Sequence, residues 1–507
     1  MNKFFKIIIL CLVLCMAIGV FVACENTKYG PIGTTEDKDK EVINNGSLVV
    51  QQGKYLYYVN GMDATSNITK PEDNYFGKAS VKGSIMKSEI AEDGSLKNTA
   101  VVVPKMMYTA ATNGGIYIYG EWIYYMTPST KTDNQSNVLV DQLVAMRTKI
   151  DGTKTEQIAE LSANNNQYVF TESAFIYYEG TSLKKVGYSN SSVDKKASEI
   201  AKDITGILFT NNSTTIFFTK ATESKVRQNN NIYVVANGQV KEVTTDATYE
   251  GSENDLSKQY VFSLLQYDAK ENVLYYSKSN SSSDASKITG TYGYKFGEDF
   301  SFDASKEKMY AVSALSTFVS LGFDKGLMDM SAVELKLYKP INAGSFVNDT
   351  EVYATLSATG AKVIKIDDTY MYYVLSNKLY RIKYADKKAV VEQISNDEDL
   401  INTSWLSASI IGDYLYYIDN TYSYLFRMDL SSYVAEPNNI EFAKSEIVSG
   451  TRKAKLTKND KDEIVIEYVA DDANEEGVTY YQIPKFMTEK DIDTYAAAIY
   501  KDPESDK

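Results

Sequence analysis

An all-β fold of repeated four-stranded sheets is predicted by three observations. First, two adjacent aromatic residues recur seven times in the 507-residue sequence, each time inside a short apolar run. Second, successive pairs lie 40 to 67 residues apart, except for one interval of 97 residues, and a four-stranded propeller blade needs a repeat of this length. Third, polar and apolar positions alternate as in half-buried strands from Gly46 almost to the C-terminal end.

These observations predict a β-propeller of seven or eight four-stranded blades, with a short C-terminal helix. The blade count depends on the 97-residue interval, in which Phe318–Phe323 is the best candidate for a degenerate blade. The count is seven if that interval is only an insertion. The aromatic pairs are Tyr57-Tyr58, Tyr124-Tyr125, Tyr177-Tyr178, Phe217-Phe218, Tyr275-Tyr276, Tyr372-Tyr373 and Tyr416-Tyr417.

Residues 1–23 have the features of a secretory signal. Two lysines precede an uncharged, mostly apolar run that ends in Ala23-Cys24. The segment Phe21–Cys24 resembles the bacterial lipobox, in which the cysteine is acylated and becomes the mature N-terminus. This resemblance implies lipid attachment, with acyl chains such as palmitate, at Cys24. The alternative is an uncleaved signal anchor, because the apolar run is close to the roughly 20 residues that span a membrane.

Residues 24–46 are predicted to form a flexible polar tether. They contain the turn signal Gly30-Pro31 and the charge run Glu36–Glu41. Twenty residues of such a chain reach about 25 Å on average. We therefore expect a lipid-anchored domain on the extracellular side of the cell membrane, held clear of the lipid headgroups.

Cysteine and histidine usage excludes several kinds of chemistry. Cys11 and Cys15 would leave with the signal, so that Cys24 is the one cysteine of the mature chain and no disulfide can form. The sequence contains no histidine. Catalytic Ser-His-Asp triads, Cys-His pairs and the common zinc sites are therefore excluded.

The charge balance bounds the partners. Removal of Lys3 and Lys6 with the signal leaves 51 basic against 67 acidic residues, a net charge of about −16. Such a surface disfavours nucleic acid and is repelled by anionic lipid headgroups. The lipid on Cys24 is the expected membrane contact.

The propeller is expected over residues 47–440. The clearest repeats place an aromatic strand, such as Tyr414–Ile418, before a turn and a strand of the Leu-Tyr-Arg type, such as Leu379–Ile382. Asp-Gly hairpin signals follow at Asp93-Gly94 and Asp151-Gly152. This combination resembles the bacterial extracellular propellers related to the low-density-lipoprotein-receptor type, many of which are lipoproteins without an assigned function. The resemblance implies a fold and says little about the ligand.

The aromatic pairs are interpreted as packing residues rather than sugar-stacking platforms. Adjacent side chains in a strand point to opposite faces, so each pair sends one ring into each of the two neighbouring blade interfaces. Sugar stacking remains a candidate role for tyrosines in loops, such as Tyr29, Tyr249 and Tyr422. Arg381 and Arg427 could line a central channel, but a blade-to-blade ion pair is the preferred interpretation.

Residues 441–507 are expected to form a hairpin, a short helix and an acidic tail. Glu463–Val469 and Val478–Ile483 have strand patterns on either side of an acidic loop. The hairpin either adds outer strands to the first blade or forms an appendage. Glu489–Tyr500 is predicted to be helical after a capping residue at Thr488.

No catalytic, cofactor-binding or metal-binding residue is assigned. Calcium is the one cation left open, because it accepts loop carboxylates, but the acidic clusters lack the spacing of known calcium motifs and are interpreted as solvated loops. These clusters are Asn396–Asp399, Asn459–Glu463 and Asp471–Gly477.

Two functions of different class follow. The preferred one is a non-enzymatic binding scaffold for a protein, peptide or glycan, with Thr127–Asn137 and Ser277–Ser286 as candidate binding rims. The alternative is a histidine-free, carboxylate-driven enzyme that acts on glycans, which needs two carboxyl groups about 5 to 10 Å apart. Trp122 and Trp405 are the two tryptophans of the chain, and this scarcity argues mildly against sugar hydrolysis.

Overall fold

The computed structural model describes most of the predicted propeller. The described residues are 37–62, 83–103, 115–129, 142–162, 167–210, 213–220, 231–236, 238–244, 261–279, 289–331, 334–342, 350–355, 360–383, 390–402, 408–421, 423–436, 439–462, 464–470, 472–478 and 480–484. The predicted signal, Cys24 and the predicted helix Glu489–Tyr500 lie outside them. Within the described part of the chain, no helix has the length and apolar character needed to cross a membrane.

Eight antiparallel sheets follow one another along the chain, and the fold is an all-β propeller of eight four-stranded blades. We number the blades in chain order and call the first strand of each blade its inner strand. Blade 1 is β2 (Val49–Gln52), β3 (Tyr55–Val59), β4 (Ile85–Ile90) and β5 (Leu96–Val103), with the short β1 (Val42–Ile43) beside β2; blade 2 is β6 (Tyr117–Tyr119), β7 (Trp122–Pro128), β8 (Gln142–Lys149) and β9 (Thr155–Ser162); blade 3 is β10 (Tyr168–Phe170), β11 (Ala174–Glu179), β12 (Ser182–Gly187) and β13 (Ser198–Ala201); blade 4 is β14 (Ile204–Leu208), β15 (Ile216–Lys220), β16 (Asn231–Ala236) and β17 (Gln239–Thr244).

The remaining four blades complete the set that the repeat predicts. Blade 5 is β18 (Val261–Asp268), β19 (Val273–Ser279), β20 (Gly290–Lys295) and β21 (Lys308–Ala311), with β25 (Ile341–Asn342) beside β21; blade 6 is β22 (Phe318–Ser320), β23 (Leu327–Asp329), β24 (Glu334–Tyr338) and β26 (Thr350–Thr355); blade 7 is β27 (Lys362–Ile366), β28 (Tyr370–Leu375), β29 (Lys378–Lys383) and β30 (Val391–Gln393); blade 8 is β31 (Ala408–Ile411), β32 (Tyr414–Ile418), β33 (Leu425–Asp429) and β36 (Lys444–Ile447), and β34 (Val434–Glu436) pairs with β35 (Asn439–Glu441) as a separate hairpin.

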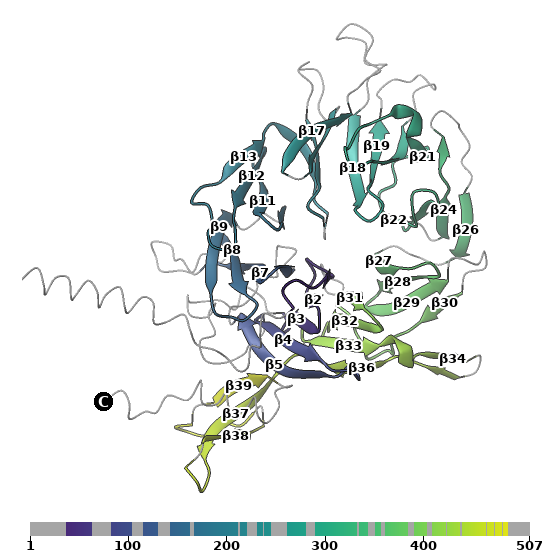
Figure 1. Ribbon diagram of the computed structural model, residues 1–507. Coiled ribbons are helices and arrows are strands. Elements are labelled where there is room, and N and C mark those ends of the chain that lie inside the picture. The colour runs from purple at the N-terminus through teal and green to yellow at the C-terminus, as the bar shows by residue number, and fades with distance from the viewer. Residues whose placement is uncertain are drawn as a thin grey trace, which may run out of the picture. The chain divides into compact units, whose positions relative to one another are not determined.

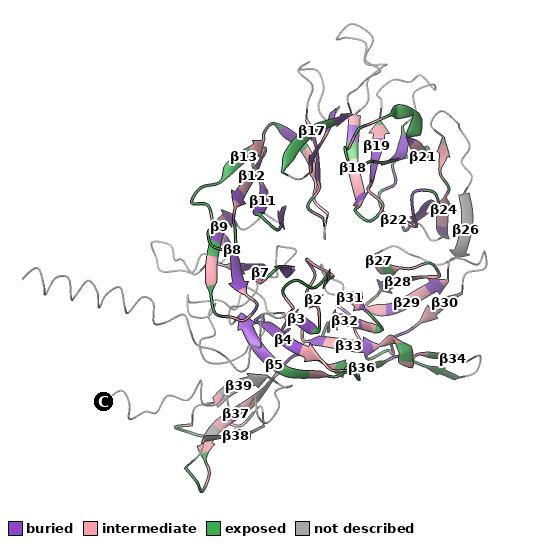
Figure 2. Cartoon of the chain, in the orientation of Figure 1, coloured by how far each residue is buried: buried purple, intermediate pink, exposed green. Residues whose placement is uncertain are grey.

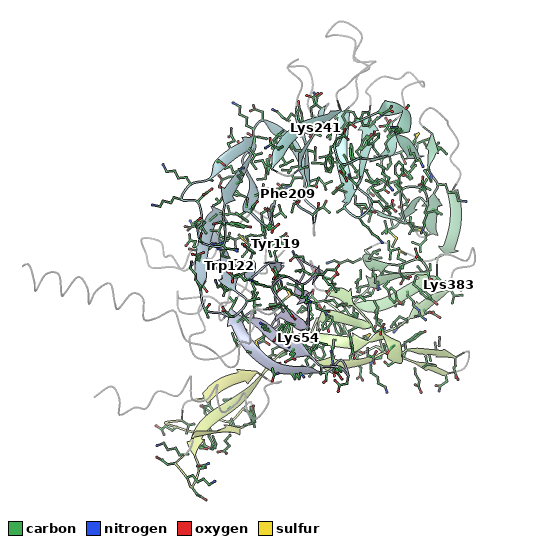
Figure 3. The ribbon with its side chains drawn as sticks, viewed as in Figure 1. Lys54, Tyr119, Trp122, Phe209, Lys241 and Lys383 are labelled. Carbon is green, nitrogen blue, oxygen red and sulfur yellow. The ribbon has the colours of Figure 1, made fainter. Side chains whose placement is uncertain are left out.

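The chain forms two compact units. One comprises residues 1–164, 423–426 and 447–507, and the other comprises residues 165–422 and 427–446. Within the second unit, successive sheets follow one another with their inner strands on the same side (Figure 1). Phe209, just after the inner strand β14, lies on that side, whereas Lys241 of β17 and Lys383 of β29 lie on the outer side (Figure 3).

Each of the seven aromatic pairs lies on the second strand of a blade, and blade 6 is the degenerate unit predicted near Phe318. In blade 5, Tyr275 and Tyr276 pair with Gly293 and Tyr292 of the third strand. In blade 6, the corresponding second-strand positions carry Met328 and Asp329, which pair with the third strand in the same way. The repeat is hidden there because neither residue is aromatic.

The packing of Tyr275 and Tyr276 confirms that one pair serves two interfaces. Tyr276 belongs to the apolar cluster between blades 4 and 5, together with Phe217. Tyr275 belongs to the cluster between blades 5 and 6, together with Leu327, and its ring meets Phe318 edge to face at 5.7 Å. Its hydroxyl also lies 2.7 Å from Ser320 Oγ. The alternation of a β-strand therefore lets one dipeptide join a blade to both neighbours.

A buried cation faces the aromatic pair of blade 2. Arg147 is fully buried and lies directly across from Tyr124, with its Cζ 4.0 Å from the centre of the Trp122 ring. Trp122 itself is paired with Tyr119 across β6 and β7 (Figure 3). Arg147 Nε donates to Glu156 Oε2 at 2.8 Å. Burial opposes ionisation of Glu156, but hydrogen bonds from Lys154 and Arg147 outweigh it and lower the pKa of this carboxyl.

Arg381 and Arg427 are arranged in the same way. The prediction that these arginines form ion pairs between blades is wrong. Arg381 pairs with Glu392 on the neighbouring strand of its own blade, and Arg427 pairs with Glu446 in the same way. The partners lie on adjacent strands of one sheet, which brings each carboxylate within reach of the guanidinium. Arg381 does contact a neighbouring segment, because its Cζ lies 4.9 Å from the Tyr433 ring.

The C-terminal strands also pair differently from the predicted hairpin. β38 (Ile464–Tyr468) and β39 (Tyr480–Pro484) both pair with β37 (Thr451–Lys458), so that the sheet order is β38-β37-β39. The middle strand has four basic residues in eight and no aromatic residue, so its sequence does not have the pattern of the blade strands. Just before it, Gly450 N–H donates to Asn60 Oδ1 at 2.8 Å, which ties this end of the first unit to blade 1.

Candidate functional site

The inner strands of blades 5, 6 and 7 are less buried than the strands behind them. In blade 7, every residue of β27 is half-buried or exposed, whereas β28 contains three fully buried residues (Figure 2). β22 of blade 6 is half-buried throughout, and most of β18 in blade 5 is half-buried. These three neighbouring inner strands are therefore partly accessible, although several of their apolar side chains also pack against the core.

A pocket of about 510 Å³ lies on these three inner strands. This volume is within the range of small-ligand sites, roughly 300–1,000 Å³. One part of the lining is polar and contains one carboxylate and two ammonium groups. The polar lining residues are Gln266, Asp268, Thr317, Ser320, Lys362 and Lys365.

The rest of the lining is apolar. Phe318 and Val319 come from β22, and Met330 follows β23. The Phe318 ring is supported from behind by Tyr275, as described above. The remaining apolar lining residues belong to the segment around β27 and are Ala361, Val363, Ile364 and Ile366.

A β-bulge places the two lysines on one face of blade 7. Lys362 pairs with Val374 and Lys365 pairs with Tyr372, whereas Ile364 between them has no partner in the ladder. Val374 and Tyr372 are two positions apart on β28 and therefore share a face. The extra residue Ile364 brings lysines three positions apart to that same face, where regular alternation would separate them.

The charged groups of the pocket differ in their environment. Burial lowers the pKa of Lys362 to about 8. Asp268 caps the turn after β18, because its Oδ1 accepts the backbone N–H of Lys270 at 2.9 Å and of Glu271 at 3.2 Å. Lys365 is exposed. The pocket therefore carries two cations against one carboxylate that also holds a turn.

Three side chains of the acidic segment Asn396–Asp399 bond to other groups of the protein. Asn396 Oδ1 accepts the backbone N–H groups of Glu398 and Asp399 at 2.8 Å each. Asp397 pairs with Lys378, and Asp399 Oδ1 accepts the hydroxyl of Ser445 at 2.6 Å. Among the described residues there is no group of three or more Asp, Glu, Cys or His side chains placed to hold a metal ion.

The other two acidic clusters have members outside the described residues, namely Glu463 and Asp471. One described carboxylate of each cluster pairs with a lysine of β37. Asp462 lies 3.0 Å from Lys458, and Glu475 lies 3.7 Å from Lys455.

Several residues named from the sequence also lie outside the described part of the chain. These are Cys24, Tyr29, Tyr249, Tyr422, Trp405 and most of the two predicted rims, Thr127–Asn137 and Ser277–Ser286.

Sequence reasoning missed the pocket. Its two lysines lie in the short strand Lys362–Ile366. They are three positions apart, so the regular alternation of a strand would place them on opposite faces. Only the ladder around Ile364 reveals the bulge that places both on one face.

Comparison with known proteins identifies no family for this chain. No family model matches the sequence, and no curated protein matches it. Among solved structures, the β-propeller domain of the Trilobed protease from Pyrococcus furiosus is similar, with 9% identity, a TM-score of 0.33, and coverage of 77% of this chain and 94% of that chain. Apo AztD from Citrobacter koseri is similar with 9% identity, a TM-score of 0.33, and coverage of 73% and 96%. YCF48 from Cyanidioschyzon merolae shows 13% identity, a TM-score of 0.30, and coverage of 60% and 90%. The eight four-stranded sheets of this chain define its class as a β-propeller, and the ligand has to be argued from this chain alone.

Proposed function

We propose that this protein is a lipid-anchored, extracellular β-propeller that binds its ligand in the pocket on β18, β22 and β27. The pocket is the observation that carries the proposal, since it joins a concave apolar wall to a few polar groups on rigid strands. Its size suits the end of a peptide or a short sugar rather than a flat protein surface. The anchor is Cys24, supported by the resemblance of Phe21–Cys24 to a lipobox.

The chemistry of the pocket favours binding over glycan hydrolysis. A glycosidase needs two carboxyl groups about 5 to 10 Å apart, one of them as an acid. Asp268 is the one carboxylate in the pocket lining, and its Oδ1 holds the turn at Lys270. With no second carboxylate in its lining, the pocket lacks the pair of groups that cleaves a glycosidic bond in this way.

A binding experiment on the full chain tests the proposed site. Purified protein in detergent is applied to an array of short peptides and to an array of glycans, beside a Val319→Trp variant in which the larger side chain fills the pocket. The variant should keep the all-β circular dichroism spectrum and lose binding to the array members that the wild type retains. Equal binding by both proteins would place the ligand elsewhere.

The anchor is tested separately. Cells that express the wild type or a Cys24→Ser variant are labelled with radioactive palmitate and fractionated. The wild type should carry the label and sediment with membranes, whereas the variant should carry no label. A labelled variant, or an unlabelled wild type, would contradict lipid attachment at Cys24.

A further inference from the structure

We infer that the ligand of this pocket is a short extended peptide, which pairs through its backbone with the inner edge of β27 as an added strand. The inner edge is the edge of β27 that lies away from β28. The inference rests on the proposed function, because it names the ligand class of the same pocket.

The pocket runs along the inner edge of β27. Its lining includes the six consecutive residues 361–366, which contain the whole of β27. Successive side chains of a strand point to opposite faces, so a pocket on one face of blade 7 would touch about every second residue. The other edge of β27 is covered by β28. The pocket therefore follows the edge that pairs with no strand among the described residues.

A strand edge of this kind is suited to an extended peptide. About every second residue of a strand turns its N–H and C=O groups towards a given edge, where a second backbone can bond to them. Every residue of β27 is half-buried or exposed, so the edge is accessible. β27 has five residues and is about 17 Å long at 3.3 Å per residue, which matches a peptide of similar length. A sugar has no such regular row of donors and acceptors, whereas peptides bind strand edges in this way.

Blade 1 already has an added strand at the corresponding edge. β1 pairs antiparallel with β2, the inner strand of that blade, and Val42 and Ile43 lie opposite Gln52 and Gln51. An inner edge in this protein therefore accepts an extended backbone. β27 is the inner strand of blade 7, and its sheet has no strand in the place that β1 takes in blade 1 among the described residues.

The two faces of blade 7 determine the side-chain pattern of the peptide. Val363 lies opposite Tyr373, on the face that packs in one apolar cluster with Met330. Lys365 lies opposite Tyr372, on the other face. Alternate side chains of an added strand continue these two faces. The peptide should therefore have apolar residues at every second position and polar residues between them.

The test is isothermal titration of the full chain in detergent at pH 7. The probe is the uncharged peptide acetyl-Thr-Val-Thr-Val-Thr-amide, and a peptide of the same composition with both valines first is the control for the pattern. Two further peptides carry N-methyl groups, one on the amides of the valines and the other on the amides of the threonines, so that each loses the donors of one edge. The probe should bind, the pattern control should bind more weakly, and at least one methylated peptide should lose about tenfold or more in affinity.

Hydrogen exchange locates the added strand on the protein. The amide groups of residues 361–366 should exchange more slowly in the presence of the probe, because pairing protects an edge that water otherwise reaches. β14 is the matched control, since it is the inner strand of blade 4 and lies outside the pocket lining. Its exchange should not change.

The contradicting outcomes separate the two proposals. No binding of the probe at millimolar concentration, unchanged affinity of both methylated peptides, or unchanged exchange over residues 361–366 would each overturn the inference of an added strand. The proposed function would survive all three if Val319→Trp still abolished binding to an array member. It would fail if that variant bound every array member like the wild type.

Discussion

At the scale of single residues, cations in this protein are placed against aromatic rings. Arg147 stacks on Trp122 and Arg427 lies 4.2 Å from the ring of Tyr414, each with a glutamate of the adjacent strand as its ion-pair partner. The delocalised guanidinium suits such a place, because it can stack on a ring and bond to a carboxylate at the same time. Buried arginine is thus a packing element of the blades.

Arg147→Ala is therefore expected to destabilise the protein. Loss of a buried partner leaves Glu156 beside an emptied position, and we expect a decrease of about 2–4 kcal/mol in the free energy of unfolding. Urea denaturation followed by tryptophan fluorescence measures it. Lys154→Ala serves as the control, because that lysine also pairs with Glu156 but its side chain is 46% exposed; this change should cost less than about 1 kcal/mol. Equal losses for the two variants would refute the role given to Arg147.

Lys362 should behave in the opposite way, as a residue that lowers stability at neutral pH. Burial lowers its pKa from 10.5 to about 8, so between these values the unfolded chain binds more protons than the folded chain. Stability therefore rises with pH through this window, and the burial penalty on the charged form is fully present below about pH 8.

Lys362→Met should then increase the free energy of unfolding at pH 7, and this gain should shrink as the pH rises from 8 towards 10.5. Urea denaturation at pH 7 and at pH 10 measures both values, with Lys202→Met as the control for removing one charge. A variant less stable than the wild type at pH 7 would show that Lys362 supports the fold instead of the pocket.

At the scale of strands and blades, the aromatic dipeptide is the unit that joins neighbouring sheets. The pairs could be read from the sequence because the period of a strand forces adjacent rings into different interfaces. Blade 6 was harder to recognise, since Met328 and Asp329 occupy the corresponding positions there. Met328 fills its interface as an aromatic ring would, in a cluster with Met371 and Tyr373 of blade 7.

Tyr275 tests this account of the blade interface. Tyr275→Phe removes the hydroxyl that contacts Ser320 and should lower the free energy of unfolding by about 1 kcal/mol. Tyr275→Ala also removes the ring from the cluster between blades 5 and 6 and should cost about 3–5 kcal/mol. Tyr468→Ala, at a ring that is 36% exposed, is the surface control and should cost less. The interface role would be rejected if the two alanine variants were equally stable.

At the scale of the whole molecule, the sequence was sufficient for the architecture but not for the site. Spacing and alternation predict repeated four-stranded sheets, because every blade needs the same pattern of buried and exposed positions at the same interval along the chain. The pocket depends on features without such a period. The bulge at Ile364 is one irregularity in one strand, and the inner strands approach each other only through the fold. The strand order of the C-terminal sheet could not be predicted for a related reason, because β37 shares no motif with the blades.

The central claim is that the inner-strand pocket of this propeller holds its ligand. Its most direct test is isothermal titration of the strongest binder from the arrays into the full chain and into the Val319→Trp variant. We expect saturable binding at one site in the wild type and no measurable heat of binding in the variant, with unchanged circular dichroism. Equal affinity of both proteins for that ligand would contradict the claim.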